Sequence, residues 1–165
     1  MDRSTKATLA AAAFILAAVA AGMGRKPPAG RAQKEDSMTD VSGLAATDVT
    51  PSRWSGSYSG RQEPGSVVVA DAQDWQDIWK QAFGKEAPTV DFNKYFAVAA
   101  FAGLRNTGGF SVEFLPPAAE GSSVTIPWRV KPPGKGAFVT MAFTQPFAIQ
   151  LYRKTPLPVK TMEER

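Results

Sequence analysis

Residues 71–84 read DAQDWQDIWKQAFG, and this stretch decides the fold. Its apolar side chains recur at spacings of three and four, which places them on one face of an α-helix; they are Trp75, Ile78, Trp79, Ala82 and Phe83. Asp71 is a favourable N-cap residue, and Gly84 is a favourable helix terminator. The sequence therefore predicts a helix whose aromatic face must cover an apolar surface.

The segments around this helix have the patterns of β-strands. Residues 95–102 (YFAVAAFA) form a continuous apolar run, which is typical of a central strand buried on both faces. Alternating or β-branched patterns predict further strands at 66–70, 110–115, 124–130, 138–143 and 147–152, with additional short ones at 53–60 and 157–162. Short turns join them, so residues 53–165 are expected to form an α+β domain. Its core would be a single antiparallel β-sheet or a small sandwich of roughly six to seven strands with one covering α-helix.

Residues 1–21 have the layout of a secretory signal helix. Arg3 and Lys6 precede a run over 7–21 that is apolar except for Thr8, and the sequence AVA at 18–20 fits a cleavage site. The run is shorter than the roughly 20 residues that span a bilayer, which leaves an uncleaved signal anchor as the alternative. Residues 22–52 are small and polar without any period, which predicts a flexible, disordered linker. We therefore expect an exported protein of the periplasm, the cell surface or the medium.

The composition excludes several kinds of functional site. The chain has no Cys and no His, which removes disulfides, thiolate and imidazole metal ligands, and Cys-His or Ser-His-Asp catalysis. Its 19 basic and 15 acidic residues give a charge of +4, and cleavage after residue 20 would leave 17 and 14, or +3. So small an excess predicts no affinity for nucleic acid. We expect no catalytic residues, no cofactor and no metal site.

Two basic loops hold the candidate partner-binding residues, which are Arg105, Asn106, Thr107, Lys131 and Lys135. The first loop, 105–109, ends in a Gly pair whose amides would suit an anion. The same Gly pair equally suits a hairpin turn. The second loop, 131–136 (KPPGKG), could meet an acidic partner or remain a solvated turn.

Three other chemistries find weaker support. Asp91 with Glu113 or Glu120 would make a catalytic carboxylate pair, but nothing in the sequence brings these residues together. The segment 56–60 (GSYSG) is superficially similar to a nucleophile elbow, although its central residue is Tyr and the chain has no His. Four aromatic residues could form a platform for glycan, or belong to the core instead: Trp54, Tyr58, Trp128 and Tyr152.

Several short motifs, taken in order, resemble a known family. They are the Trp-containing helix, Val90-Asp91-Phe92 before an apolar strand that ends at Gly103, Thr107-Gly108-Gly109-Phe110-Ser111-Val112, and Thr144-Gln145-Pro146-Phe147-Ala148-Ile149. Over about residues 66–162 the chain is similar to the PrcB C-terminal domain family, named after a subunit of a spirochaete surface protease complex. The resemblance implies an accessory protein of a subtilisin-like protease, without catalytic residues to carry over. The named member is a lipoprotein, whereas this chain has no Cys for acylation.

The signal segment, the missing His and Cys and the resemblance together predict an exported, non-catalytic module that binds another protein. That partner is expected to be a secreted protease, which the module would stabilise or assemble. Two alternatives stay open: a protease inhibitor acting through a Pro-containing loop such as 129–136, and a cell-surface module for glycan or a small ligand. We expect no nucleic-acid partner, and membrane contact only through an uncleaved N-terminal segment.

Overall fold

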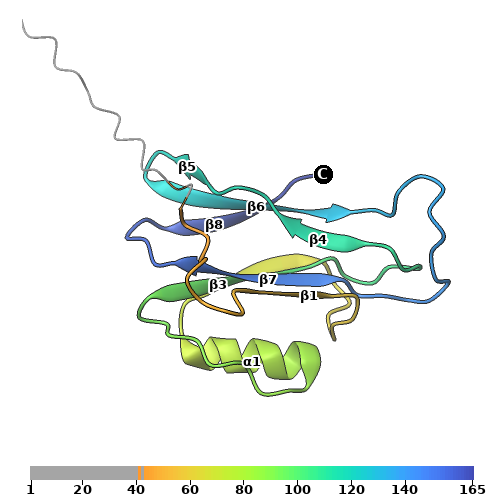
Figure 1. Cartoon of the computed structure of the whole chain (residues 1–165), viewed down its shortest axis with the longest axis horizontal. Coiled ribbons are helices and arrows are strands. Elements are labelled where there is room, and N and C mark those ends of the chain that lie inside the picture. Colours follow the sequence, from red (N-terminus) through yellow and green to blue (C-terminus); the bar gives the residue numbers. More distant parts are fainter. Residues whose placement is uncertain (1–40, 42) are drawn as a thin grey trace, which may run out of the picture. The chain divides into compact units, whose positions relative to one another are not determined.

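The computed structural model describes residues 41 and 43–165, so the expected signal helix and most of the expected linker lie outside the described residues. Within the described part there are one helix and eight strands (Figure 1). The helix is α1 (Ala72–Phe83), and the strands are β1 (Arg53–Gly56), β2 (Gly65–Val69), β3 (Tyr95–Phe101), β4 (Ser111–Phe114), β5 (Ala118–Glu120), β6 (Ser123–Lys131), β7 (Phe147–Arg153) and β8 (Val159–Glu163).

The helix begins and ends where its sequence predicts. A side-chain oxygen of Asp71 accepts a hydrogen bond from the backbone amide of Asp74 at 2.9 Å, which satisfies one of the free donors of the first turn. Gly84 adopts the left-handed conformation at φ 64°, and its amide donates to the carbonyl oxygen of Lys80 at 2.9 Å. Both predicted helix ends are therefore confirmed.

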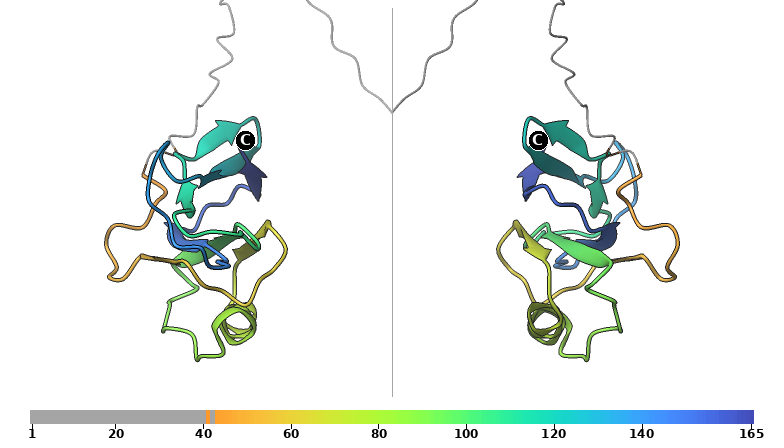
Figure 2. Two further views of the ribbon diagram at one scale, coloured as in Figure 1. Left: turned by 90° about the vertical axis from the view of Figure 1, so that its right-hand side faces the viewer. Right: turned by 90° about the vertical axis from the view of Figure 1, so that its left-hand side faces the viewer.

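The strands form two sheets with one covering helix, which agrees with the α+β class and with the small sandwich among the two expected arrangements. The first sheet is antiparallel and has the order β1-β7-β3-β2. In the second sheet, β6 pairs with β4 and β5 in antiparallel fashion and with β8 in parallel. Figure 2 shows the resulting layers: α1, then the first sheet, then the second sheet.

Strand β3 lies in the middle layer and is buried on both faces. Its side chains alternate: Ala97 and Phe101 belong to the cluster under α1, whereas Phe96 and Val98 belong to a cluster shared with β6. This alternation confirms the prediction made from its continuous apolar sequence. All seven residues of β3 are buried, so this strand joins the two hydrophobic layers.

The aromatic face of α1 covers the first sheet, as the sequence predicts. Trp75 is buried, and its indole nitrogen donates to the carbonyl oxygen of Pro88 at 2.7 Å. The ring centroids of Trp54 and Trp79 lie 5.6 and 5.5 Å from that of Trp75, which are normal aromatic packing distances. The tryptophans of α1 therefore belong to the hydrophobic core and do not form a binding face.

Three expectations about the strands are wrong. Residues 138–143 form no strand but belong to the long loop between β6 and β7. A short strand absent from the sequence prediction, β5, follows the pair Pro116-Pro117, and the number of strands is eight where six or seven were expected. The parallel pairing of β8 with β6 also departs from an all-antiparallel arrangement, because the chain crosses from the first sheet to the second after β7.

The end of the expected linker belongs to the folded domain. Leu44 and Ala46 are buried, and the amide of Ala46 donates to the carbonyl oxygen of Leu151 at 3.0 Å. The ordered domain therefore begins before Arg53, because a few apolar side chains between polar residues suffice to hold this segment on the core. In the part of the chain described, no helix has the length and apolar character needed to cross a bilayer.

Candidate protein-binding surface

Three loops meet at one end of the sheets, where β3 finishes and β7 starts. They are residues 57–58, 102–110 and 132–146, and we call their combined exposed face the loop end (Figure 1). Four backbone hydrogen bonds of 2.8–2.9 Å join them, from the amides of Arg105, Thr144, Gly108 and Gln145 to the carbonyl oxygens of Thr144, Arg105, Thr140 and Ser57 respectively. The loop end is therefore one connected surface built from distant parts of the sequence.

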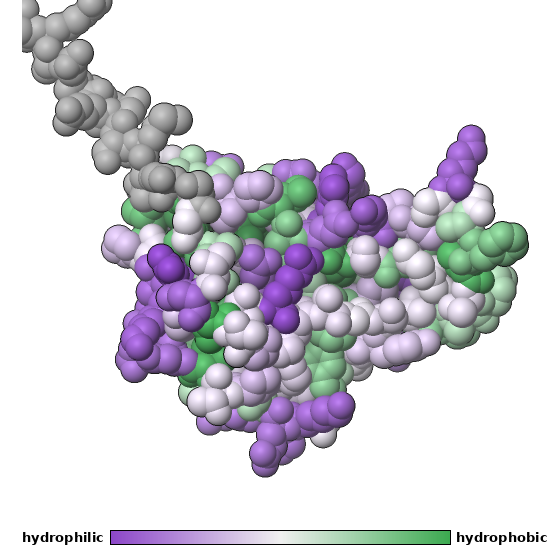
Figure 3. Space-filling model, in the orientation of Figure 1, coloured by the Kyte–Doolittle hydropathy of each residue, from purple (hydrophilic) through white to green (hydrophobic). Residues whose placement is uncertain are grey.

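Most of the exposed large apolar side chains of the described residues gather on the loop end. They number five of six: Tyr58, Leu104, Phe138, Met141 and Phe143. Phe138 has an exposed fraction of 106%, and those of Met141 and Phe143 are 87% and 67%. Figure 3 shows hydrophobic surface at the right-hand end of the molecule, where Figure 1 has the loop between β6 and β7. Single exposed apolar side chains are common, but a gathered set of them marks an interaction site.

The charges of the loop end all have one sign. Its two larger loops, 102–110 and 132–146, contain Arg105 and Lys135 and no Asp or Glu. An apolar surface with only cationic neighbours is complementary to an apolar partner surface that has acidic groups around it.

The predicted residues of the first loop are placed here, but most of them serve the loop itself. A guanidinium nitrogen of Arg105 donates to the carbonyl oxygen of Ala102 at 2.8 Å, and the group lies 5.5 Å from the centre of the Phe110 ring. The carbonyl oxygen of Thr107 accepts a hydrogen bond from Thr144, whereas Asn106 is exposed. Only Asn106 is thus fully available to a partner.

The glycine pair of the first loop packs against the second loop. The amide of Gly108 donates a hydrogen bond to the carbonyl oxygen of Thr140, so this amide is not free to bind an anion. Gly109 has φ 84°, and a Cβ atom there would lie 2.8 Å from both Pro133 and Val139. Glycine is therefore required at these two positions, because Gly109 has a left-handed backbone conformation and because the close approach of the two loops leaves no room for a side chain.

The predicted lysines of the second loop have different surroundings. Lys131 lies at the end of β6, and its ammonium is 3.1 Å from the carboxylate of Glu113, which also contacts Arg129 at 3.1 Å. Lys131, and then Arg129, hold the pKa of Glu113 below its usual value. Lys135 is exposed in the loop itself. Of the two, Lys135 is the cation closer in sequence to the apolar side chains.

Sequence reasoning missed the residues that dominate this surface. Phe138, Met141 and Phe143 lie in a segment whose composition suits a strand, so this segment was expected to form one. The available signal was the proline on each side: Pro132-Pro133 before the segment and Pro146 after it restrict pairing with a neighbouring strand.

The carboxylates considered as a catalytic pair have separate structural roles. Asp91 accepts a hydrogen bond from the amide of Asn93 at 3.0 Å and pairs with Lys94 at 3.3 Å; the amide of Asn93, more than Lys94, lowers the pKa of Asp91. Glu120 accepts a hydrogen bond from the hydroxyl of Thr125 at 2.9 Å. No three acidic residues of the described chain lie close enough to hold a metal ion.

The four aromatic residues considered for a glycan platform do not share a surface. Trp54 packs under α1, Tyr152 packs between the sheets, and Trp128 belongs to a third cluster with Val112. Tyr58 is exposed on the loop end. The proposed platform is therefore absent, and Tyr58 joins a different surface.

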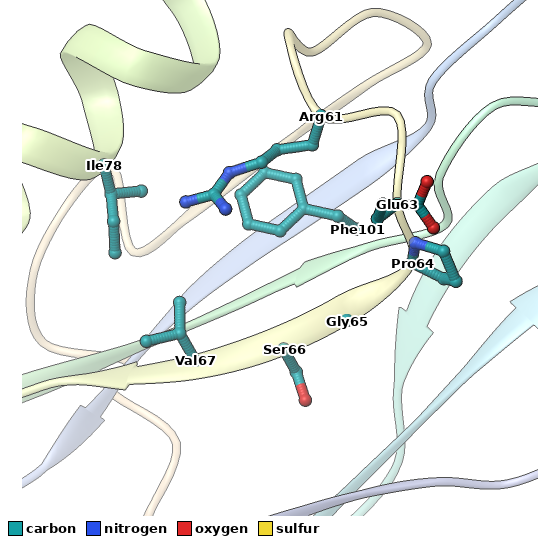
Figure 4. A pocket seen from close by; sticks show the side chains of 8 residues that line it. All are labelled: Arg61, Glu63, Pro64, Gly65, Ser66, Val67, Ile78 and Phe101. Carbon is teal, nitrogen blue, oxygen red and sulfur yellow. The ribbon is translucent and has the colours of Figure 1, made fainter.

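A hollow of about 300 Å³ lies between α1 and the outer edge of β2 (Figure 4). The guanidinium of Arg61 lies 5.3 Å from the centre of the Phe101 ring, and Ile78 and Val67 complete the apolar lining. The carboxylate of Glu63 points away from Arg61 in this view. The hollow contains none of the predicted site residues and is separate from the loop end.

Comparison with known proteins gives one match. Residues 96–149 match a family model described as PrcB C-terminal. The matched segment extends from β3 into β7 and contains both larger loops of the loop end. No curated protein and no solved structure matches the chain.

Proposed function

From the match of residues 96–149 to the PrcB C-terminal family model, we propose that this protein is an exported, non-catalytic module that binds another protein through its loop end. It acts as an accessory or stabilising subunit of a secreted protease complex. One observation carries the proposal: five exposed apolar side chains gather on three loops that backbone hydrogen bonds tie together. Large apolar side chains that gather in water lower the solubility of a protein. Association with a partner covers these side chains and removes that cost.

The loop end is pre-organised for binding. The bridge between Arg105 and Thr144 and the contact of Gly108 with Thr140 hold the two larger loops in one arrangement. Binding therefore requires little further ordering of the backbone, and more of the interaction energy appears as affinity. Aromatic and Met side chains are the types enriched at protein interfaces.

The first described residues lie away from the loop end. Val41 packs against the cluster that contains Phe96, and Ala45 bridges to Tyr152 near the end of β7. These contacts lie at the opposite end of the two strands from the loop end.

Substitution of the apolar side chains tests this function. The variant Phe138→Ser, Met141→Ser, Phe143→Ser should fold normally and lose its partner protease, which we would measure by co-purification from the native envelope and by the lifetime of that protease. Met162→Ser, which changes an exposed apolar residue of β8 outside the loop end, is the matched control. Full retention of the protease by the triple variant would refute the role of this surface.

A further inference from the structure

Residues 137–140 (AFVT) form an exposed segment that is fixed on both sides. The amide of Ala137 donates to the carbonyl oxygen of Gly134 at 2.9 Å, and the carbonyl oxygen of Thr140 accepts from the amide of Gly108 at 2.9 Å. Between these two points Val139 packs against Gly109, whereas the ring of Phe138 is fully exposed. The loop thus holds one large apolar side chain outward on a backbone of restricted freedom.

The backbone at the centre of this segment is also free. Among the described residues, neither the amides nor the carbonyl groups of Phe138 and Val139 form backbone hydrogen bonds. A partner can therefore pair with this backbone as with an added strand while it receives the Phe138 ring in a pocket. Binding sites of this kind recognise extended polypeptide, and the substrate clefts of endoproteases are the chief example.

We propose that residues 137–140 occupy the substrate cleft of an endoprotease whose primary pocket accepts a large apolar side chain, with Phe138 in that pocket. This goes beyond the proposed function, since it shares only the loop end as the binding surface and assigns the site on a protease that this surface blocks. The segment blocks the cleft without turnover, because the bonds to Gly134 and Gly108 keep both sides of the Phe138–Val139 peptide in place.

A bilayer is the less suitable occupant. The unpaired backbone groups of Phe138 and Val139 would lose their water in hydrocarbon and gain no partner there.

Three proteases of known pocket chemistry provide the test. The full chain should inhibit chymotrypsin and a subtilisin, whose primary pockets are apolar, and leave trypsin, whose pocket is acidic, unaffected; turnover of chromogenic peptides at equimolar inhibitor is the readout. Phe138→Ala should weaken inhibition about 100-fold, as loss of a central anchor does. Phe138→Arg should transfer inhibition to trypsin. Met162→Ala should leave the wild-type pattern unchanged.

Three results would overturn the proposal. The first is wild-type protein that inhibits neither chymotrypsin nor subtilisin. The second is rapid cleavage between Phe138 and Val139 with release of activity, which would make the loop a substrate. The third is sedimentation with phosphatidylglycerol vesicles that Phe138→Ala abolishes, which would assign the surface to a membrane.

The two proposals fail in distinguishable ways. In one outcome, the triple serine variant loses the native partner, and the wild-type protein inhibits none of the three proteases. This outcome would support the proposed function and contradict the cleft assignment. Inhibition that follows Phe138, with the native complex unaffected by the triple variant, would support the cleft assignment and remove the accessory role.

Discussion

The hydroxyl of Thr144 donates a hydrogen bond to the backbone carbonyl oxygen of Thr107 at 2.8 Å. Thr144 is 2% exposed, so its hydroxyl cannot exchange this partner for water. The bond lies beside the backbone bridge between Arg105 and Thr144. One buried threonine therefore fixes the relative position of the two loops that form most of the loop end.

Replacing this threonine by valine tests that relationship. Thr144→Val keeps the shape of the side chain and leaves the carbonyl oxygen of Thr107 without its donor, so we expect a loss of about 1–3 kcal/mol in unfolding free energy. Chemical denaturation measures it. Thr89→Val, at an exposed position, is the control and should change stability by less than about 0.5 kcal/mol. Equal stability of both variants would show that the bond contributes nothing.

A second prediction concerns the close approach of the two loops. Gly109→Ala introduces a Cβ atom at a left-handed φ and against Pro133 and Val139, so it should destabilise the loop end by about 1–3 kcal/mol and weaken partner binding. Gly134→Ala lies in the same loop region, where an added Cβ atom meets nothing within 4 Å. Thermal unfolding and binding of the two variants should therefore differ, and identical behaviour would argue against the contact.

A third prediction separates the two tryptophans of α1. Trp75→Phe leaves the carbonyl oxygen of Pro88 without its donor and should cost about 1–3 kcal/mol. The buried indole nitrogen of Trp79 has no partner among the described residues, so Trp79→Phe removes an unsatisfied donor and should cost less than about 1 kcal/mol. Trp75→Ala should cost about 3–5 kcal/mol through the cavity it leaves. Denaturation curves of the two Phe variants that coincide would contradict this assignment.

The elements that were predictable are those whose side-chain pattern agrees with both local geometry and packing. Residues 71–84 contain a cap, a terminator and an apolar stripe, and they give α1 at Ala72–Phe83. Residues 95–102 have no polar position at all, which only a strand covered on both faces can accommodate, and they give β3 at Tyr95–Phe101. In both cases burial and local preference favour the same structure.

The loop end was not predictable, because there the two criteria disagree. Residues 138–143 have the composition of a strand, yet Phe138, Met141 and Phe143 face solvent, which is the arrangement a binding surface requires. Arg105 and Lys131 were predicted to bind a partner, but the guanidinium of Arg105 donates to the carbonyl oxygen of Ala102 and the ammonium of Lys131 pairs with Glu113. A sequence shows which side chains are charged, but the fold determines which groups they contact.

The carboxylate of Glu113 gives a pH dependence. Lys131 and then Arg129 lower its pKa in the folded protein below the value of about 4.3 of an unfolded chain. The contribution of this cluster to stability is therefore complete above that unfolded value and is lost as the pH falls through the lower, folded value. We expect the fall in melting temperature between about pH 5 and pH 3 to be shallower in Glu113→Gln than in wild type. Glu63→Gln removes one exposed carboxylate elsewhere and serves as the control; a change of slope equal to that of Glu113→Gln would contradict the assignment.

The segment before β1 provides the last prediction. Leu44 packs between the sheets with Phe96 and Tyr152, and its carbonyl oxygen accepts a hydrogen bond from the amide of Arg153 at 2.7 Å. Leu44→Ala removes buried methyl groups from this cluster and should cost about 2–4 kcal/mol in unfolding free energy. Thr47→Ala, exposed in the same segment, should change stability by less than about 0.5 kcal/mol.

A chain that begins at Arg53 should be destabilised at least as much as Leu44→Ala, because it lacks Leu44, Ala46 and the hydrogen bonds of both residues to β7. Urea denaturation of the two proteins gives the comparison. Wild-type stability in the shortened chain would mean that residues 43–52 rest on the domain without stabilising it. A shared loss would place the folding boundary before Leu44, because the burial of Leu44 and Ala46 and the added backbone pairing outweigh the entropy of ordering this short segment.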